Sequence, residues 1–146
     1  NLKIADLAAI LNVSTYTLSY LFNQYLDKNY YDCSSFVYRT YRAVGRYLVC
    51  KTSWAPVAAD IGHYYVRKGK SIKAKKTYSE KKMRPGDLIC FGGLKARRNG
   101  RYKRIYHIAV YIGNGKTMES SSTYNNVVIR DRGVFKKSEI PVVVRP

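Results

Sequence analysis

The stretch Tyr31-Asp32-Cys33-Ser34-Ser35-Phe36-Val37 places a cysteine directly in front of an apolar run with helical spacing. That run continues along one helix face through three further apolar side chains, Tyr41, Val44 and Leu48. Asp32, Ser34 or Ser35 can cap the first turn of the predicted helix. We therefore expect Cys33 at a helix N-terminus, where the positive end of the helix dipole favours a nucleophilic thiolate. A buried structural cysteine is the alternative interpretation.

The C-terminal half of the chain is predicted to form short strands joined by tight turns. These strands are expected at residues 88–91, 105–112, 116–120, 127–129 and 142–144. Residues 57–66 are compatible with a second short helix. Because strands joined by short turns pair in antiparallel fashion, helices followed by such a sheet indicate an α+β fold.

A nucleophilic cysteine needs a base, and the chain has two histidines, His63 and His107. His107 begins an apolar strand, which is a rigid platform for aiming an imidazole at a helix N-terminus. His63 lies in a tyrosine-rich segment, where packing or surface exposure is a sufficient explanation. We therefore favour His107 as the base.

The length of the hairpin loop after this strand decides which side chain can orient the imidazole. A three-residue loop, Gly113–Gly115, places Glu119 one diagonal step from His107 on the same sheet face. A two-residue loop, Asn114–Gly115, moves the register by one and places Ser120 on that face instead. We favour Glu119, because a carboxylate both orients an imidazole and stabilises its cation.

Three blocks of sequence together resemble the NlpC family of papain-like cell-wall cysteine peptidases over residues 30–146. The blocks are residues 32–37, 84–89 and 106–116. The resemblance implies a papain-like fold, in which a cysteine at a helix N-terminus packs on an antiparallel sheet. It also implies hydrolysis of peptide bonds in peptidoglycan stem peptides, by an endopeptidase or an amidase. Cys33 would be the nucleophile, His107 the base and Glu119 the third polar residue, which is often a histidine in the family.

Residues flanking the nucleophile are candidates for substrate binding. Asp32 and Ser34 are the two nearest, and the family usually carries a Tyr-x-x-Gly-Gly segment upstream of its cysteine. In this chain Tyr20 stands at the tyrosine position, but Asn23 and Gln24 replace the glycines. We retain Tyr20 as a candidate. The Cys, His and acidic residues show no metal-ligand spacing, so we expect neither a metal nor a cofactor.

Residues 1–29 form a separate segment that is predicted to be helical. Its apolar pattern predicts two short helices, and the sequence of residues 4–29 resembles the first helix-turn-helix of AraC-type regulators. However, the second helix carries no Lys or Arg between Ser14 and Asp27, and such a helix is poorly suited to contacting DNA. We therefore expect a helical pair packed on a peptidase domain at 30–146, with a DNA-binding protein as the alternative.

The formal net charge of +18, from 27 Lys and Arg against 9 Asp and Glu, indicates an anionic partner. The cations gather at 67–84 and 95–104, which we interpret as solvated loops or anion-binding strips. Anionic cell-wall polymers are the expected partners, and nucleic acid is less favoured. A third alternative keeps the fold as a catalytically inactive wall-binding module.

Cysteine number and hydropathy bear on where the protein works. Three cysteines argue against a pure disulfide framework, and we expect Cys50 and Cys90 to be free thiols. The sequence holds no apolar stretch long enough for a membrane span. No leader precedes Asn1, so a signal peptide is absent, was removed, or lies outside a fragment. From the family resemblance we expect a secreted or cell-wall-associated protein.

Overall fold

The computed structural model describes residues 32–43, 46–49, 56–121 and 126–146. Within these ranges the chain forms an α+β fold, as the sequence predicts. The helices are α3 (Cys33–Ala43), α4 (Ala58–Arg67) and the short 3-10 helix η1 (Tyr102–Arg104). The strands are β1 (Leu88–Phe91), β2 (His107–Gly113), β3 (Lys116–Ser121), β4 (Asn126–Asp131) and β5 (Val142–Val144). The predicted helical pair at 1–29, Tyr20 and Cys50 lie outside the described residues, whereas Cys90 is a free thiol.

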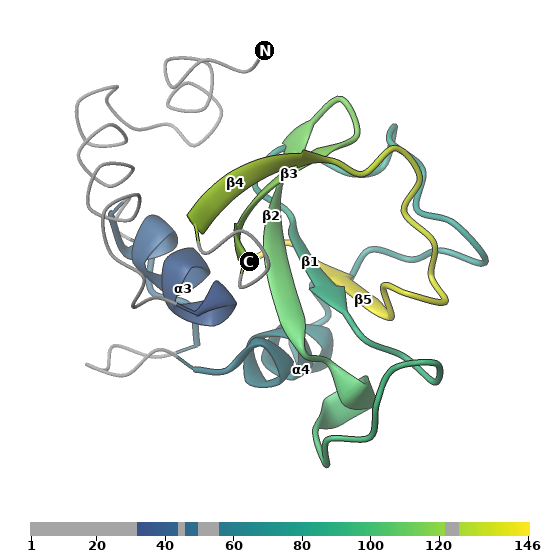
Figure 1. The fold of residues 1–146 in the computed structure, drawn as a ribbon, viewed down its shortest axis with the longest axis horizontal. Helices are drawn as coiled ribbons and strands as arrows, with labels where there is room; N and C mark the ends of the chain where they lie inside the picture. Colours follow the sequence, from purple (N-terminus) through teal and green to yellow (C-terminus); the bar gives the residue numbers. More distant parts are fainter. Residues whose placement is uncertain (1–31, 44–45, 50–55, 122–125) are drawn as a thin grey trace.

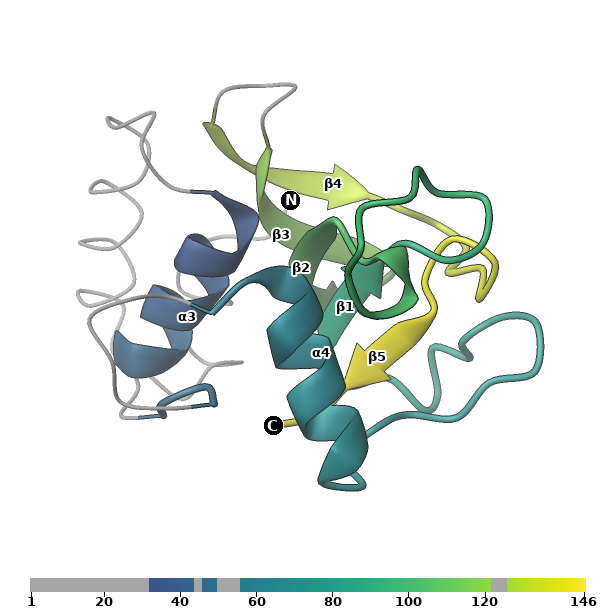
Figure 2. The same cartoon turned by 90° about the horizontal axis from the view of Figure 1, so that it is seen from below.

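The five strands form one antiparallel sheet with the order β4-β3-β2-β1-β5. Helix α3 packs on β2 and β3, and α4 packs on β1 and β5, so the two helices lie side by side over the sheet (Figure 1). The view from below shows the same arrangement (Figure 2). None of the helices in the described residues is long and apolar enough to cross a membrane.

Strand alternation divides the apolar side chains between the two faces of the sheet. On one face, Leu88 and Cys90 of β1 pack with buried residues of both helices. On the other face, Ile89 and Phe91 pack with Tyr78 and other buried side chains from the loops at 72–83 and 135–140. Both faces are therefore covered, which holds the sheet rigid enough to carry a precise site.

The predicted helix after Cys33 ends earlier than its apolar pattern suggests. Helix α3 stops at Ala43, where the backbone N–H of Arg46 donates to the carbonyl of Tyr41 at 3.0 Å, a bond typical of a helix C-terminus. Leu48 lies in a bend beyond the helix but is still buried in the same core as Phe36. The apolar spacing therefore identified a core residue correctly and its secondary structure wrongly.

The β2–β3 hairpin combines features of both predicted loops. Its turn has two residues, Asn114 and Gly115, and both have the positive φ angles (53° and 71°) of a tight hairpin turn. A bulge between Tyr111 and Gly113 then accommodates one extra residue. Beyond it, Tyr111 pairs with Thr117, which is the register predicted for the longer loop. This register brings Glu119 to the face that carries His107.

Candidate active site

Cys33 is the first residue of α3, and the residue before it caps the helix. One carboxylate oxygen of Asp32, Oδ1, accepts hydrogen bonds from the backbone N–H of Ser35 at 2.8 Å and from the Ser34 hydroxyl at 3.1 Å. Burial opposes ionisation of Asp32, but these bonds from Ser35 and Ser34 lower its pKa. Among the three predicted capping residues, Asp32 is therefore the cap. It holds Cys33 half-buried at the positive end of the helix dipole.

His107 is the first residue of β2 and lies between Cys33 and Glu119. Its Nε2 is 3.0 Å from Oε1 of Glu119, and the side chain of Cys33 lies near enough to the ring to raise its pKa. The ring packs against Phe91, the residue opposite it in β1, with 5.3 Å between ring centroids. Burial lowers the pKa of His107, but the interactions with Cys33 and Glu119 outweigh burial and raise it to about 9. The imidazole is therefore held as a cation at neutral pH.

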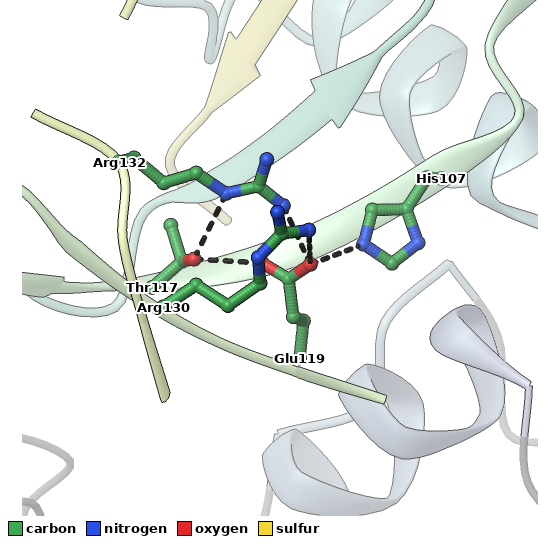
Figure 3. Close-up of polar contacts among 5 residues, drawn as sticks. All are labelled: His107, Thr117, Glu119, Arg130 and Arg132. Carbon is green, nitrogen blue, oxygen red and sulfur yellow. Dashed lines mark hydrogen bonds and ion pairs between the residues drawn. The ribbon is translucent and has the colours of Figure 1, made fainter. Parts of the chain in front are cut away.

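Glu119 of β3 is buried, with only 1% of its side chain exposed, and it is surrounded by hydrogen-bond donors (Figure 3). Its Oε1 accepts from His107, from Arg132 at 2.5 Å and, at 3.5 Å, from Arg130. Its Oε2 accepts from the Thr117 hydroxyl at 2.7 Å. Burial raises the pKa of Glu119, but the bonds from His107, Arg132 and Thr117 lower it to about 2. The carboxylate is therefore ionised and fixed in place.

The structure thus brings together Cys33, His107 and Glu119, which the sequence named, and adds three side chains that it did not. Thr117 could have been found from strand alternation, because it lies two residues before Glu119 on the same face. The two arginines come from β4 and the residue after it, and the sequence offers no local pattern that singles them out among 27 Lys and Arg. Only the physical requirement that a buried carboxylate needs a cationic partner points to such residues.

The second histidine lies apart from this group. His63 of α4 stacks on the ring of Tyr102 in η1, with 4.0 Å between ring centroids and 10° between ring planes. This packing agrees with the structural interpretation of His63. In the described part of the chain, no three His, Cys, Asp or Glu side chains are grouped so that they could hold a metal ion.

The charges of the site alternate along one line of contacts. A Cys33 thiolate, the His107 imidazolium, the Glu119 carboxylate and the Arg132 guanidinium would each neighbour a group of opposite sign. Such an order stabilises the ion pair that a nucleophilic cysteine requires. The arrangement is suited to acyl transfer through a thioester.

Comparison with known proteins gives one family. The NlpC/P60 family model matches residues 19–139. No curated protein matches the chain. Nothing in these matches supports the helix-turn-helix alternative.

Three solved structures illustrate the likeness of fold. An NlpC/P60 family protein from Bacillus cereus has a TM-score of 0.52 and 18% identity, over 79% of this chain and 31% of that one. The peptidoglycan hydrolase RipB from Mycobacterium tuberculosis has a TM-score of 0.50 and 22% identity, over 78% and 44%. The NlpC/p60 domain of the peptidoglycan hydrolase SagA has a TM-score of 0.50 and 15% identity, over 99% and 100%. The chain therefore spans less than half of the first two proteins and the whole of the third.

Proposed function

The chain belongs to the NlpC/P60 family, which is known for peptidoglycan hydrolases of the cysteine peptidase type, and on that premise we propose that it hydrolyses peptide bonds in peptidoglycan stem peptides. An endopeptidase acting between D-Glu and a diamino acid is the reaction we favour over an amidase. The observation that carries the proposal is the position of His107, which is bonded to the buried Glu119 and lies near the Cys33 thiol at the start of α3.

The proposed reaction proceeds in two steps. The Cys33 thiolate attacks the scissile carbonyl carbon, and the His107 imidazolium gives its proton to the leaving amine as the C–N bond breaks. The neutral imidazole then takes a proton from a water molecule as the water oxygen attacks the thioester. The C–S bond breaks, the acid leaves, and the Cys33 thiolate and the His107 imidazolium are restored. Glu119 holds the ring and stabilises its cation in both steps. The backbone N–H of Cys33 at the helix start is the proposed donor to the oxyanion.

Substrate binding is assigned to residues beside the nucleophile. We propose that Asp32 and Ser34 contribute mainly by fixing the start of α3, since their side chains bond to each other and to the backbone there. Tyr20 remains a proposed substrate contact. The protein would act at the cell wall, outside the membrane, where this substrate lies.

The second basic run borders the proposed site. Phe91 and His107 lie opposite each other in the sheet, so the loop 92–106 begins and ends at the imidazole. It contains six Lys and Arg and no Asp or Glu. Arg104 donates to the carbonyls of Leu94 and Ala96 within the loop, whereas the other five cations are exposed. We propose that this loop attracts anionic cell-wall polymers.

The salt dependence of peptidoglycan digestion can distinguish an effect of this loop from an effect of the protein's net charge. Reversing Lys95, Arg97 and Arg98 to Glu should flatten the salt dependence with which intact peptidoglycan is digested. Reversing Lys73, Lys75 and Lys76, exposed cations of the other run, changes net charge equally and should have a smaller effect. Equal effects of the two reversals would show that only net charge matters.

Digestion of purified peptidoglycan tests the proposed reaction directly. The parent should release fragments whose masses and new amino groups identify the cut bond, and Cys33→Ala should release none. Cys90→Ala is a matched control, because Cys90 is a buried thiol on the helix-covered face and should keep the activity. Binding without fragments would favour the inactive wall-binding module, and salt-sensitive binding to duplex DNA instead would favour the DNA-binding alternative.

A further inference from the structure

We propose that Arg132 is a positioning residue that fixes the Glu119 carboxylate against His107; this inference rests on the proposed function. Arg132 follows β4 directly and lies outside the sequence blocks that contain the cysteine and the histidine. One of its terminal nitrogens is 2.5 Å from Oε1 of Glu119, the same oxygen that lies 3.0 Å from Nε2 of His107. The guanidinium therefore acts on the imidazole through the carboxylate. Among the contacts of the described residues, none joins the Arg132 guanidinium directly to the Cys33 thiol.

Glu119 cannot serve its role without a compensating cation. A carboxylate with 1% exposure loses its hydration, and a buried ion left unpaired costs several kcal/mol or takes up a proton. A protonated Glu119 would no longer stabilise the His107 cation. Among the residues that the structure describes, four groups face this carboxylate: His107 from β2, Thr117 from β3, Arg130 from β4 and Arg132 after it. His107 changes its charge during catalysis, so the constant charge must come from the arginines.

Arg132 is the better placed of the two arginines. Its contact with Glu119 is 1.0 Å shorter than that of Arg130 (2.5 against 3.5 Å), and its side chain is 20% exposed against 38%. Figure 3 shows both guanidinium groups reaching the carboxylate from a different direction than His107. Water screens the more exposed and more distant Arg130 more strongly, so Arg132 supplies most of the stabilisation.

The Arg132 guanidinium is itself held by its surroundings. Its Cζ lies 4.4 Å from the centre of the Phe91 ring, and the same ring packs against His107. Its Nε is 3.5 Å from the Thr117 hydroxyl, and its backbone N–H donates to the carbonyl of Gly115 at 2.8 Å. Phe91 thus supports both the guanidinium and the imidazole. A planar guanidinium can stack on the ring and donate to the carboxylate at once, which a lysine ammonium cannot do equally well.

The test compares Arg132→Gln and Arg132→Lys with the parent and with Arg67→Gln, which removes an exposed arginine at the end of α4. Two quantities are measured across pH: kcat and KM on peptidoglycan fragments, and the rate of Cys33 alkylation. In Arg132→Gln we expect kcat to fall roughly 10- to 100-fold with little change in KM. We also expect the acid limb of both profiles to move up by about one pH unit or more, because Glu119 then binds its proton more readily. Arg132→Lys should recover part of both losses.

Several results would overturn this role. An acid limb that stays in place in Arg132→Gln, or a loss no larger than that of Arg67→Gln, would show that Arg132 is only structural. If Arg132→Gln does not fold, Arg132→Lys must still show a smaller shift of the limb in the same direction, or the proposal fails. Alkylation needs no hydrolysis, so a parent that cuts no peptidoglycan would refute the proposed function while the Arg132 profiles still decide this inference.

Discussion

Replacing Glu119 with Gln removes the charge at the centre of the site while keeping its shape. The change leaves the His107 cation and the Arg132 guanidinium without their shared anion, although Gln can still accept one hydrogen bond through its side-chain oxygen. Removing one partner of a fully buried ion pair costs roughly 3 to 5 kcal/mol. Arg132 is 20% exposed, so water offsets part of this loss. We therefore expect the free energy of unfolding to fall by about 2 to 3 kcal/mol at neutral pH.

The same substitution should change the titration of His107. In the parent, burial lowers the pKa of His107 and the interactions with Cys33 and Glu119 raise it to about 9. Without the carboxylate, burial opposes only the Cys33 contact, so the pKa should fall toward its ordinary value of about 6.5. Loss of the orienting anion should also reduce kcat by about 100-fold or more, since an incorrectly oriented imidazole transfers protons poorly.

Urea unfolding and NMR titration measure these two effects separately. The chain has two histidines, so the imidazole spectrum is simple, and His63→Gln assigns it. Glu139→Gln is the matched control, because Glu139 is exposed and the substitution removes the same charge from the protein surface. If Glu119→Gln unfolds at the parent's urea concentration and leaves the pKa of His107 near 9, the account of Glu119 as the anchor of the imidazole is refuted.

Three further predictions concern the helix start, the pH range of stability and the loop beside His107. Asp32→Ala should lower the free energy of unfolding by about 1 kcal/mol, whereas Asp32→Asn should be near neutral because Asn also caps helices; urea unfolding distinguishes them. Because folding raises the pKa of His107, its contribution to stability is complete below about pH 6.5 and is lost as the pH rises through about 9. Because folding lowers the pKa of Glu119, its contribution is complete above about pH 4.5 and is lost as the pH falls toward about 2. Unfolding measured across pH should therefore show these two contributions together at full strength between about 4.5 and 6.5, and Glu119→Gln should flatten both flanks. In Gly92→Ala, the new Cβ would lie 2.7 Å from the carbonyl oxygen of Arg104, so we expect the free energy of unfolding to fall by about 1 to 3 kcal/mol in the same assay. An unchanged unfolding midpoint would show that the loop backbone moves to accommodate the methyl group at no cost.

Local sequence patterns were sufficient to predict the residues that lie on one element or one hairpin. The capped helix start of Cys33 depends on neighbours within three positions, and Asp32 supplies the cap. The placement of Glu119 beside His107 depends on strand alternation, which has a fixed period of two. The prediction reached the correct register through a different turn, because a bulge adds the residue that the shorter loop lacks.

Contacts between distant segments were not predictable in the same way. Arg132 reaches Glu119 only because β4 pairs with β3 and the chain then turns back over Gly115. Likewise, Asp87 of the predicted turn is buried and forms an ion pair with Arg145, which lies 58 positions later in the sequence. Neither pairing has a local sequence signature, since any of the many cations could satisfy a buried carboxylate. The three-dimensional arrangement alone selects these partners.

The most direct test of the central claim is the rate at which iodoacetamide alkylates Cys33 across pH, in the parent and in His107→Ala. Peptide mapping by mass spectrometry assigns the modification to Cys33 and separates it from the buried thiol of Cys90. We predict that Cys33 of the parent reacts rapidly at a pH well below the pKa of an ordinary thiol, about 8.5, and that His107→Ala loses this reactivity. If Cys33 reacts like an ordinary or buried thiol in both proteins, no thiolate–imidazolium pair exists and the proposed peptidase mechanism is contradicted.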